Sequence, residues 1–514
     1  MDFSEFGISS IVKLKRRFIG VETLRLIAIN RLRVILMSNA SVLDLHNLLP
    51  SMVRELYESF FYFKKGTFVG FANDLLSLSP RKQFEVWLKF IDKNETKNMD
   101  LPEISRDFSL EVVTFLEKNT THLESIQMYY NWILNKVYIN AFMNLPQLKN
   151  LTIRGYLDDE FLKLISEHCK LESLSIYGGV RPEECEEVRY GMTSRGISMF
   201  LSSQKDSLTK IDLLQMYYSR FFIGMGSSGP VSCFKNSLQE FLNLKLLQSL
   251  TISSDMFMLI NKSIQSVEEV VLSFKQATKI SYERNIFEFI LELCPNLKKA
   301  SLLDLKLNSR IAIMNNNESD VMLKETSFIQ ALKNKLGELV IEISVFLYGT
   351  IDWNSILNYV PNVEKASFVM ECDIISANDL SINNKPRIWN NLKSLSITGS
   401  LSECDFHAHL EPVILNSPKL TECTIIFYGF TPNFNEDSFL KKIQSFSLKS
   451  LETLRIHLYD KSHVMSGQTI IELLSRCSKL SYLDNIKASF NMSLSEFLVI
   501  KRLVSQRGLE LIVS

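Results

Sequence analysis

Three short stretches carry residue types that could take part in chemistry. In the first, Gly224, Gly226 and Gly229 have the glycine spacing of a turn that binds a dinucleotide. In such a turn, backbone N–H groups approach a pyrophosphate at the start of a helix. Here Pro230 follows directly, and no strand–helix–strand unit with a ribose-binding acid is evident. A flexible loop is therefore the better interpretation of this stretch.

The other two stretches combine histidine and cysteine. Cys404, His407 and His409 could ligate a metal ion, but no second pair of ligands stands nearby in the sequence. His168 and Cys169 lie at the end of an expected helix, where packing explains them better than nucleophilic chemistry. No Ser/His/Asp or paired-carboxylate arrangement has an interpretable spacing. We therefore expect no enzymatic activity, no cofactor and no metal site.

The elements that would position any such residue follow from a recurring motif, Leu-x-x-Leu-x-Φ, where Φ is apolar. The last five copies start 28, 31, 29 and 29 residues apart, and this period predicts leucine-rich repeats. Clear copies begin at Leu148, Leu171, Leu247, Leu392 and Leu451, and weaker ones begin at Leu123, Leu208, Val267, Leu297, Leu336, Val363, Leu420, Leu480 and Leu509.

Each motif predicts a short strand with one buried face, because its apolar residues alternate. Helical patterns over 161–169, 287–294 and 469–477 precede strands. One strand and one helix cannot bury their apolar surface alone, so the units should stack into an α/β solenoid, a horseshoe spanning 121–514. Cys169, Cys294 and Cys477 end three of these helices, and this resembles the cysteine-containing leucine-rich repeats of many ubiquitin-ligase receptors.

Residues 20–120 lack the repeat and read as mostly helical. Thr23, Leu24, Ala28 and Leu32 match the BC box that docks on elongin C, although Ala28 replaces the usual cysteine. Leu24, Ala28 and Leu32 lie at i, i+4 and i+8, on one face of a helix. A large leucine would enter the partner's pocket, and the small residue one turn later would let the two helices approach closely.

A second motif follows closely. Leu49, Pro50, Val53 and Tyr57 resemble the cullin-2 box, with Pro50 suited to the first turn of a new helix. Both boxes ahead of leucine-rich repeats resemble the substrate receptors of cullin-2–elongin ubiquitin ligases, namely the PRAME and zyg-eleven families. This resemblance implies elongin B/C and cullin-2 as partners and a protein substrate held by the repeats. No armadillo-like helical tail follows the repeats, so preferences tied to such a tail do not carry over.

Two alternatives remain for this region. The helices could only cap the solenoid, as every repeat array requires, which would leave a scaffold without a ligase. The stretch from Leu49 to Phe63 also fits the opening helix of an F-box, although the later part of that motif is hard to find. The expected organisation is an N-terminal segment over 1–20, box-like helices over 21–60, a helical cap over 61–120 and repeats over 121–514.

Composition limits the partners and the compartment. Lys+Arg and Asp+Glu both total 57, so the zero net charge argues against a nucleic-acid partner. No apolar run reaches the roughly 18 residues that span a bilayer. Glu5 stands where a signal peptide would have positive charge, and the eight cysteines are scattered. We therefore expect a cytoplasmic or nuclear protein.

The repeat strands should place some apolar side chains on the concave face, which we expect to be exposed to water. Such a stripe suggests a contact patch for the substrate. The alternatives are long loops that cover the stripe, or a register error of one residue, which would flip every side chain. The stripe consists of Leu214, Val271, Leu303, Val340 and Val369, with Ile426 further on.

Overall fold

The structure is a computed structural model of the 514-residue chain. The residues that it describes are 31–32, 34–35, 61–64, 67–71, 79–89, 97–101, 109–119, 122–130, 141–155, 157–177, 179–180, 193–213, 217–218, 240, 243–258, 260–275, 286–308, 323–348, 353–370, 388–399, 413–414, 416–427, 450–458, 464–466, 468, 471, 474–475, 477, 479–480, 482–484, 489–491, 493–507 and 510–512.

The chain divides into two compact units. Unit 1 comprises 1–208 and 215–227, and unit 2 comprises 209–214 and 228–514. Among the helices of the described ranges, none has the length and apolar character needed to cross a membrane.

Unit 1 contains a small parallel sheet whose strands follow one another in chain order. Helix α8 connects β5 to β6, and helix α9 follows β6, in the strand-then-helix alternation that the repeat motif predicts. The sheet strands are β3 (Asn98–Asp100), β4 (Ser125–Tyr130), β5 (Asn150–Gly155) and β6 (Ser173–Tyr177); the helices are α5 (Pro80–Lys89), α6 (Ser109–Asn119), α8 (Asp159–His168) and α9 (Ser194–Ser203); and β7 (Gly179–Val180) pairs with β9 (Tyr217–Tyr218).

Residues 61–120 differ from the helical cap expected from the sequence. β1 (Phe61–Lys64) and β2 (Thr67–Phe71) form an antiparallel pair, because their aromatic and β-branched residues favour strands. β3 lies parallel to β4, with Asn98 in register with Ser125. The repeat sheet therefore begins before residue 121, and the helices α5 and α6 are only part of this segment.

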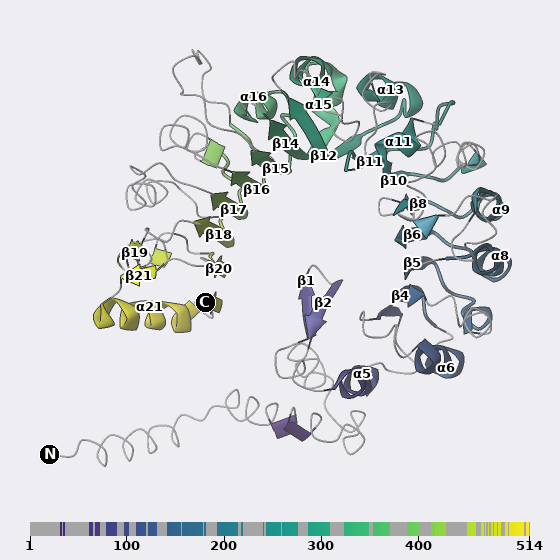
Figure 1. Ribbon diagram of the computed structural model, residues 1–514, viewed down its shortest axis with the longest axis horizontal. Coiled ribbons are helices and arrows are strands. Elements are labelled where there is room, and N and C mark those ends of the chain that lie inside the picture. The colour runs from purple at the N-terminus through teal and green to yellow at the C-terminus, as the bar shows by residue number, and fades with distance from the viewer. Residues whose placement is uncertain are drawn as a thin grey trace. The chain divides into compact units, whose positions relative to one another are not determined.

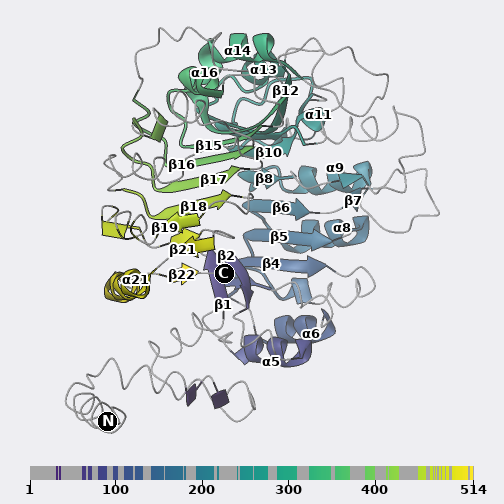
Figure 2. The same ribbon diagram turned by 60° about the vertical axis from the view of Figure 1, so that its left-hand side comes forward.

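Unit 2 contains the longer parallel sheet. Figure 1 shows α13, α14 and α16 on one side of this sheet, and Figures 1 and 2 show β15 to β18 side by side. In spatial order its strands are β8 (Lys210–Asp212), β10 (Ser249–Ser253), β11 (Glu269–Ser273), β12 (Lys299–Asn308), β14 (Val340–Tyr348), β15 (Lys365–Met370), β16 (Ser394–Gly399), β17 (Glu422–Phe427), β18 (Thr453–Leu458), β20 (Tyr482–Asp484) and β22 (Glu510–Ile512).

Shorter elements accompany this sheet. They are α11 (Ser254–Phe257), α13 (Ile286–Leu293), α14 (Glu325–Leu332), α15 (Lys335–Leu339), α16 (Trp353–Asn358) and α21 (Leu494–Arg507), with β13 (Leu323–Lys324) beside β12 and β19 (Val464–Ser466) beside β21 (Ser489–Asn491). The helices predicted near 161–169 and 287–294 are thus confirmed as α8 and α13.

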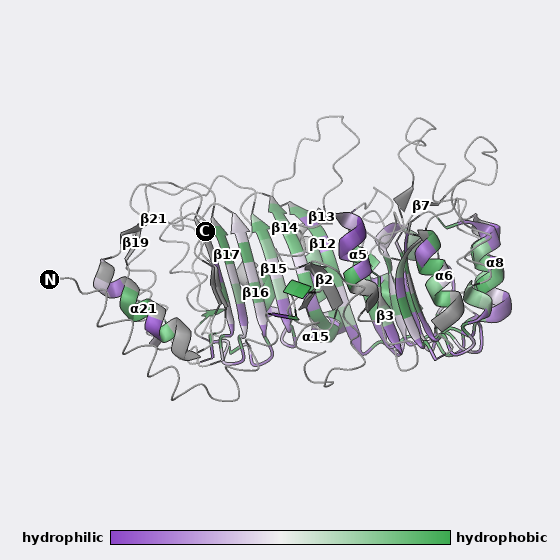
Figure 3. Cartoon of the chain, turned by 90° about the horizontal axis from the view of Figure 1, so that it is seen from below, coloured by the Kyte–Doolittle hydropathy of each residue, from purple (hydrophilic) through white to green (hydrophobic). Residues whose placement is uncertain are grey.

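The motif leucines form the core of each unit. Leu151 and Leu174 in unit 1, and Leu250, Leu395 and Leu454 in unit 2, are at most 2% exposed. In β6 and β16 every second residue is partly exposed, so buried and partly exposed side chains alternate along each strand. Figure 3 shows the corresponding alternation of hydrophobic and hydrophilic residues along the strands. The prediction of strands with one buried face is confirmed.

Paired backbone hydrogen bonds join most of the described repeats to the one before, and ahead of β15 the Glu364 N–H donates to Ile341 O. Just ahead of a strand, two successive N–H groups donate to a single carbonyl oxygen of the preceding repeat. Lys298 and Lys299 donate to Glu268 O at 2.8 and 3.0 Å, and Thr421 and Glu422 donate to Lys393 O at 2.8 and 2.9 Å. Because the same carbonyl receives both donors in repeat after repeat, the strand starts are held in a fixed register.

The start of β14 departs from the simple motif. Val340, not Leu339, stands in register with the core residue Ala300, and Val340 is completely buried. The short helix α15 and an extra residue before Glu342 shift the strand by one position. The prediction that Val340 lies on the concave face is therefore wrong, because the residue that matches the core position of β12 comes one place later than the motif beginning at Leu336 predicts.

Candidate partner-binding face

The strands of unit 2 have one face toward its helices, and no helix among the described residues of unit 2 covers the other face, which we call the open face. On β14 to β17 the open-face side chains form three rows that run across the strands. The charged row is Glu342, Lys365, Ser394 and Glu422; the hydroxyl row is Ser344, Ser367, Ser396 and Thr424; and the apolar row is Phe346, Val369, Thr398 and Ile426. All twelve side chains are partly or largely exposed.

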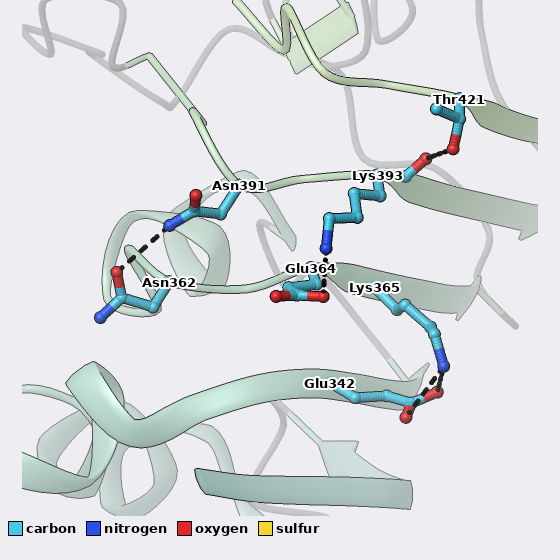
Figure 4. A network of polar contacts seen from close by, with 7 residues as sticks. All are labelled: Glu342, Asn362, Glu364, Lys365, Asn391, Lys393 and Thr421. Atoms are coloured by element: carbon cyan, nitrogen blue, oxygen red, sulfur yellow. Dashed lines mark hydrogen bonds and ion pairs between the residues drawn. The ribbon is translucent and has the colours of Figure 1, made fainter. Parts of the chain in front are cut away.

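The charged row contains one ion pair and a second carboxylate that is held by a hydrogen bond. Lys365 Nζ lies 3.5 Å from Glu342 Oε1 (Figure 4), and Ser394 Oγ donates to Glu422 Oε2 at 3.2 Å. Among the described residues, Glu422 forms no ion pair. Exposed pairs such as Lys365–Glu342 contribute little to the stability of the fold. The charged row is therefore more important for binding, because it sets the charges that a partner would contact.

A second polar ladder lies just ahead of the strands. Lys393 Nζ lies 2.7 Å from Glu364 Oε2, and the Asn391 amide donates to Asn362 Oδ1 at 3.4 Å (Figure 4). Asn362 in turn donates to the carbonyl of Glu338 at 2.8 Å. These contacts join repeat to repeat and occupy the polar groups at this edge of the sheet.

Among the described residues, the side chains of the apolar and hydroxyl rows have no such ion pair or side-chain hydrogen bond. Phe346 stands beside Val369, Thr398 separates Val369 from Ile426, and all four side chains remain partly exposed. Beside them the small hydroxyl side chains present little bulk. An exposed apolar row beside a row of small hydroxyl side chains is suited to contact with an amphipathic partner.

The structure places the predicted concave residues unequally. Val271 on β11, Leu303 on β12, and Val369 and Ile426 further along are half-buried and lie on the open face. Leu214 lies outside the described residues. Contact of these residues with a substrate stays a prediction.

In unit 1 the matching positions carry polar and aromatic groups. Asn150, Thr152 and Arg154 stand in register with Ser173, Ser175 and Tyr177. The Arg154 guanidinium carbon lies 5.3 Å from the centre of the Tyr177 ring, which is a cation–π distance. The apolar stripe is thus a feature of the unit 2 strands.

A bulge in β12 was missed by the sequence reasoning. The register shifts between Leu302 and Leu305, and Asp304 adopts a φ of 59°. Ser273 Oγ donates to Asp304 Oδ2 at 3.2 Å, which holds the carboxylate against β11. Aspartate is among the few residue types enriched in this left-handed region, but its identity alone does not reveal a bulge.

The elongin- and cullin-box residues fall mostly where no structure is described. Thr23, Leu24, Ala28, Leu49, Pro50, Val53 and Tyr57 lie outside the described residues. Leu32 is described, helical and half-buried. Its neighbours Val34 and Ile35 are also helical and are 65% and 39% exposed.

The reactive residue types do not form a chemical centre in the part of the chain that is described. There, no group of three or more His, Cys, Asp or Glu side chains could hold a metal ion. Burial raises the pKa of Cys169 to about 11 and that of Cys294 and Cys423 to about 12, so these thiols stay protonated at neutral pH. The glycine stretch 224–229 and the residues Cys404, His407 and His409 lie outside the described residues.

No family model and no curated protein matches the chain. Among solved structures, a chain of the TLR13–ssRNA13 complex is 14% identical with a TM-score of 0.34, over 79% of this chain and 59% of that one. A chain of the yeast Rad7–Elc1 complex is 15% identical with a TM-score of 0.29, over 68% and 94%.

The complex of Toll and Spatzle from Drosophila gives 10% identity and a TM-score of 0.35, over 78% of this chain and 52% of that one. This chain thus spans only about half to three fifths of the two Toll-type chains. Its own strands, register and buried motif leucines define an α/β leucine-rich-repeat fold.

Proposed function

We propose that this chain is a non-catalytic recognition protein that binds a protein partner on the open face of its unit 2 repeats. The observation that carries the proposal is the row of partly exposed apolar residues, Phe346, Val369 and Ile426, on a sheet face free of helices. Such rows are uncommon on surfaces that only meet water.

We further propose that the chain is the substrate-recognition subunit of a cullin-RING ubiquitin ligase. In this role residues 21–60 would bind elongin C and cullin-2, and the repeats would hold the substrate. The order of the two boxes supports this role, as does the exposure of Val34 and Ile35 next to Leu32. The ubiquitin chemistry would belong to the other subunits, and this chain would raise the effective concentration of its substrate. The buried free thiols suit the cytoplasm or the nucleus.

Co-expression with elongins B and C, followed by affinity capture and gel filtration, tests the ligase role. We expect a stoichiometric complex that is lost in a Leu24→Asp, Leu32→Asp double variant, because charges would enter the partner's apolar pocket. Circular dichroism and thermal unfolding of the variant show whether the repeats stay folded. A Lys13→Asp variant outside the box serves as the matched control.

The capture experiment also separates the alternatives. If folded wild-type protein forms no complex with elongins, the BC-box reading fails and the N-terminal helices cap the repeats or act as an F-box. Capture with a cullin-1 adaptor in place of the elongins would identify the F-box case.

The repeat face has its own test. We expect Val271→Glu and Leu303→Glu to weaken partner binding, because each would bury a charge against an apolar surface, and to leave the cooperative unfolding transition intact. Both side chains are half-buried on the open face. If either variant unfolds the protein, that residue belongs to the core and its assignment to the binding face is wrong.

A further inference from the structure

We infer that the open face of β14 to β17 takes one particular kind of partner, an amphipathic α-helix that lies across the strands over the hydroxyl row. Its apolar stripe would pack on Phe346, Val369 and Ile426, and a lysine or arginine on its other side would meet Glu422. This inference rests on the proposed partner-binding role and names the chemistry of the partner.

The spacing of the rows favours a helix. Neighbouring strands lie about 4.8 Å apart, and one turn of an α-helix rises about 5.4 Å. A helix lying across the strands therefore presents roughly one side chain from its stripe to each strand. In an extended peptide, side chains on the same side repeat at about 6.7 Å, which falls out of step with the strands.

The distance between the charged row and the apolar row also favours a helix as the partner. Glu422 and Ile426 are four residues apart on β17, which is about 13 Å along the strand. A helix with its side chains is about 10–12 Å wide, so it fits between the charged row and the apolar row. Thr424 lies midway between them, and with Ser344, Ser367 and Ser396 it forms a low surface that lets the helix backbone approach.

The charge of the partner follows from Glu422. Glu342 and Lys365 neutralise each other, whereas the described residues supply no cation to Glu422, which only accepts a hydrogen bond from Ser394. A bound helix would remove water from this carboxylate, and an unpaired charge under an interface is costly. A basic residue on the partner helix would supply the missing positive charge.

The test uses two displayed peptide libraries selected against the full chain, one of helix-forming 18-residue peptides and one of random linear 12-residue peptides. We expect enriched peptides from the helical library, with apolar residues at helical spacing and at least one lysine or arginine. The affinity of these peptides should be at least about tenfold lower for the Val369→Asp variant. It should fall as much for Ser367→Trp, because the indole would fill the space above the hydroxyl row.

Charge reversal provides the sharper result. Glu422→Lys should weaken the selected peptides about tenfold, and changing the peptide's basic residue to glutamate should restore binding to that variant alone. Glu338→Lys is the matched control, because Glu338 is exposed on α15 and not on the sheet. Thermal unfolding of each variant confirms that the fold is retained.

Three results would overturn the inference: no enrichment from either library, binders insensitive to Val369→Asp, or binders that need Val369 but are extended and lack a helical pattern. In the last case the open face still binds protein, so the proposed function survives while the helix inference fails. Capture of elongins tests the ligase role separately, through residues of the N-terminal segment.

Discussion

At the scale of single residues, Gln204 shows how a buried polar side chain can complete a turn. It is fully buried in unit 1; its Oε1 accepts the Leu171 N–H at 2.9 Å, and its Nε2 donates to Cys169 O at 3.0 Å. The amide therefore satisfies two backbone groups of the turn that precedes β6. A carboxylate could not do so, because it has no donor for the Cys169 carbonyl.

We expect Gln204→Ala to lower the free energy of unfolding by roughly 2–5 kcal/mol, because it leaves two buried backbone groups unpaired. Chemical denaturation monitored by circular dichroism measures this loss. The control is Asn296→Ala, which removes an amide that donates to Gln265 O at 2.8 Å in an exposed setting. An equal effect of the two substitutions would contradict the role of burial.

The buried cysteines give a second residue-scale prediction. Since burial raises the pKa of Cys169, Cys294 and Cys423 to about 11, 12 and 12, almost no thiolate is present at pH 8. We expect these three thiols to react with an aromatic disulfide reagent only after unfolding in guanidinium, as read by peptide mass spectrometry. Rapid labelling of Cys423 in the native protein would show that its strand opens readily.

At the scale of elements, the sequence predicted the regular repeats well and failed where one residue was inserted. The alternation of leucines placed β5, β6, β10 and β16 correctly, because a period of two fixes which side is buried. It misplaced Val340, since a motif cannot show that α15 adds a residue before the strand. The β12 bulge depends on tertiary register in the same way, and so do the three rows of the open face.

Gly337 explains how α15 fits into this insertion. A Cβ added there would lie 2.0 Å from Leu332 O and 2.2 Å from Tyr359 O, which are both backbone atoms. We expect Gly337→Ala to destabilise the protein by roughly 1–3 kcal/mol, because the packed backbone must shift. Glu338→Ala on the same helix is the control and should change thermal stability little. A neutral Gly337→Ala would mean that α15 moves aside at no cost.

The start of α21 carries a reciprocal cap. The Glu496 carboxylate accepts the Ser493 N–H at 2.7 Å, and Ser493 Oγ accepts the Glu496 N–H at 3.3 Å. The hydrogen bonds from Ser493 hold the pKa of Glu496 below its ordinary value of 4.5. The cap's contribution is therefore complete above pH 4.5 and is lost as pH falls through the lowered pKa.

We expect Ser493→Ala to speed hydrogen exchange of the first-turn amides of α21 at pH 7 and to weaken the pH dependence of that exchange protection, because the side-chain hydrogen bonds are lost while the backbone N–H of residue 493 still donates to Glu496. Arg502→Ala, an exposed change further along the same helix, should leave the first turn protected. Unchanged first-turn protection in Ser493→Ala would show that other contacts hold the helix start.

At the scale of the whole molecule, each repeat contacts mainly its neighbours. The loss of stability caused by a substitution in one repeat should therefore be confined to the adjacent repeats. Val345 is completely buried and stands in register with Leu305 and Phe368. We expect Val345→Ala to cost roughly 2 kcal/mol and to loosen β12, β14 and β15 while β17 and β18 keep their protection. Hydrogen exchange read by mass spectrometry resolves this, and uniform loosening of all strands would contradict nearest-neighbour stability.

The paired hydrogen bonds ahead of each strand also govern which lengths of sequence the protein can accept during evolution. A residue inserted where the donors Thr421 and Glu422 lead into β17 would move this strand out of register with the Lys393 carbonyl that both donors bind. Residues added after a strand ends disturb no such pair. Lineages of this gene should therefore gain and lose residues mainly after the strands, whereas an insertion ahead of a strand should come with a shift in register, as at β14.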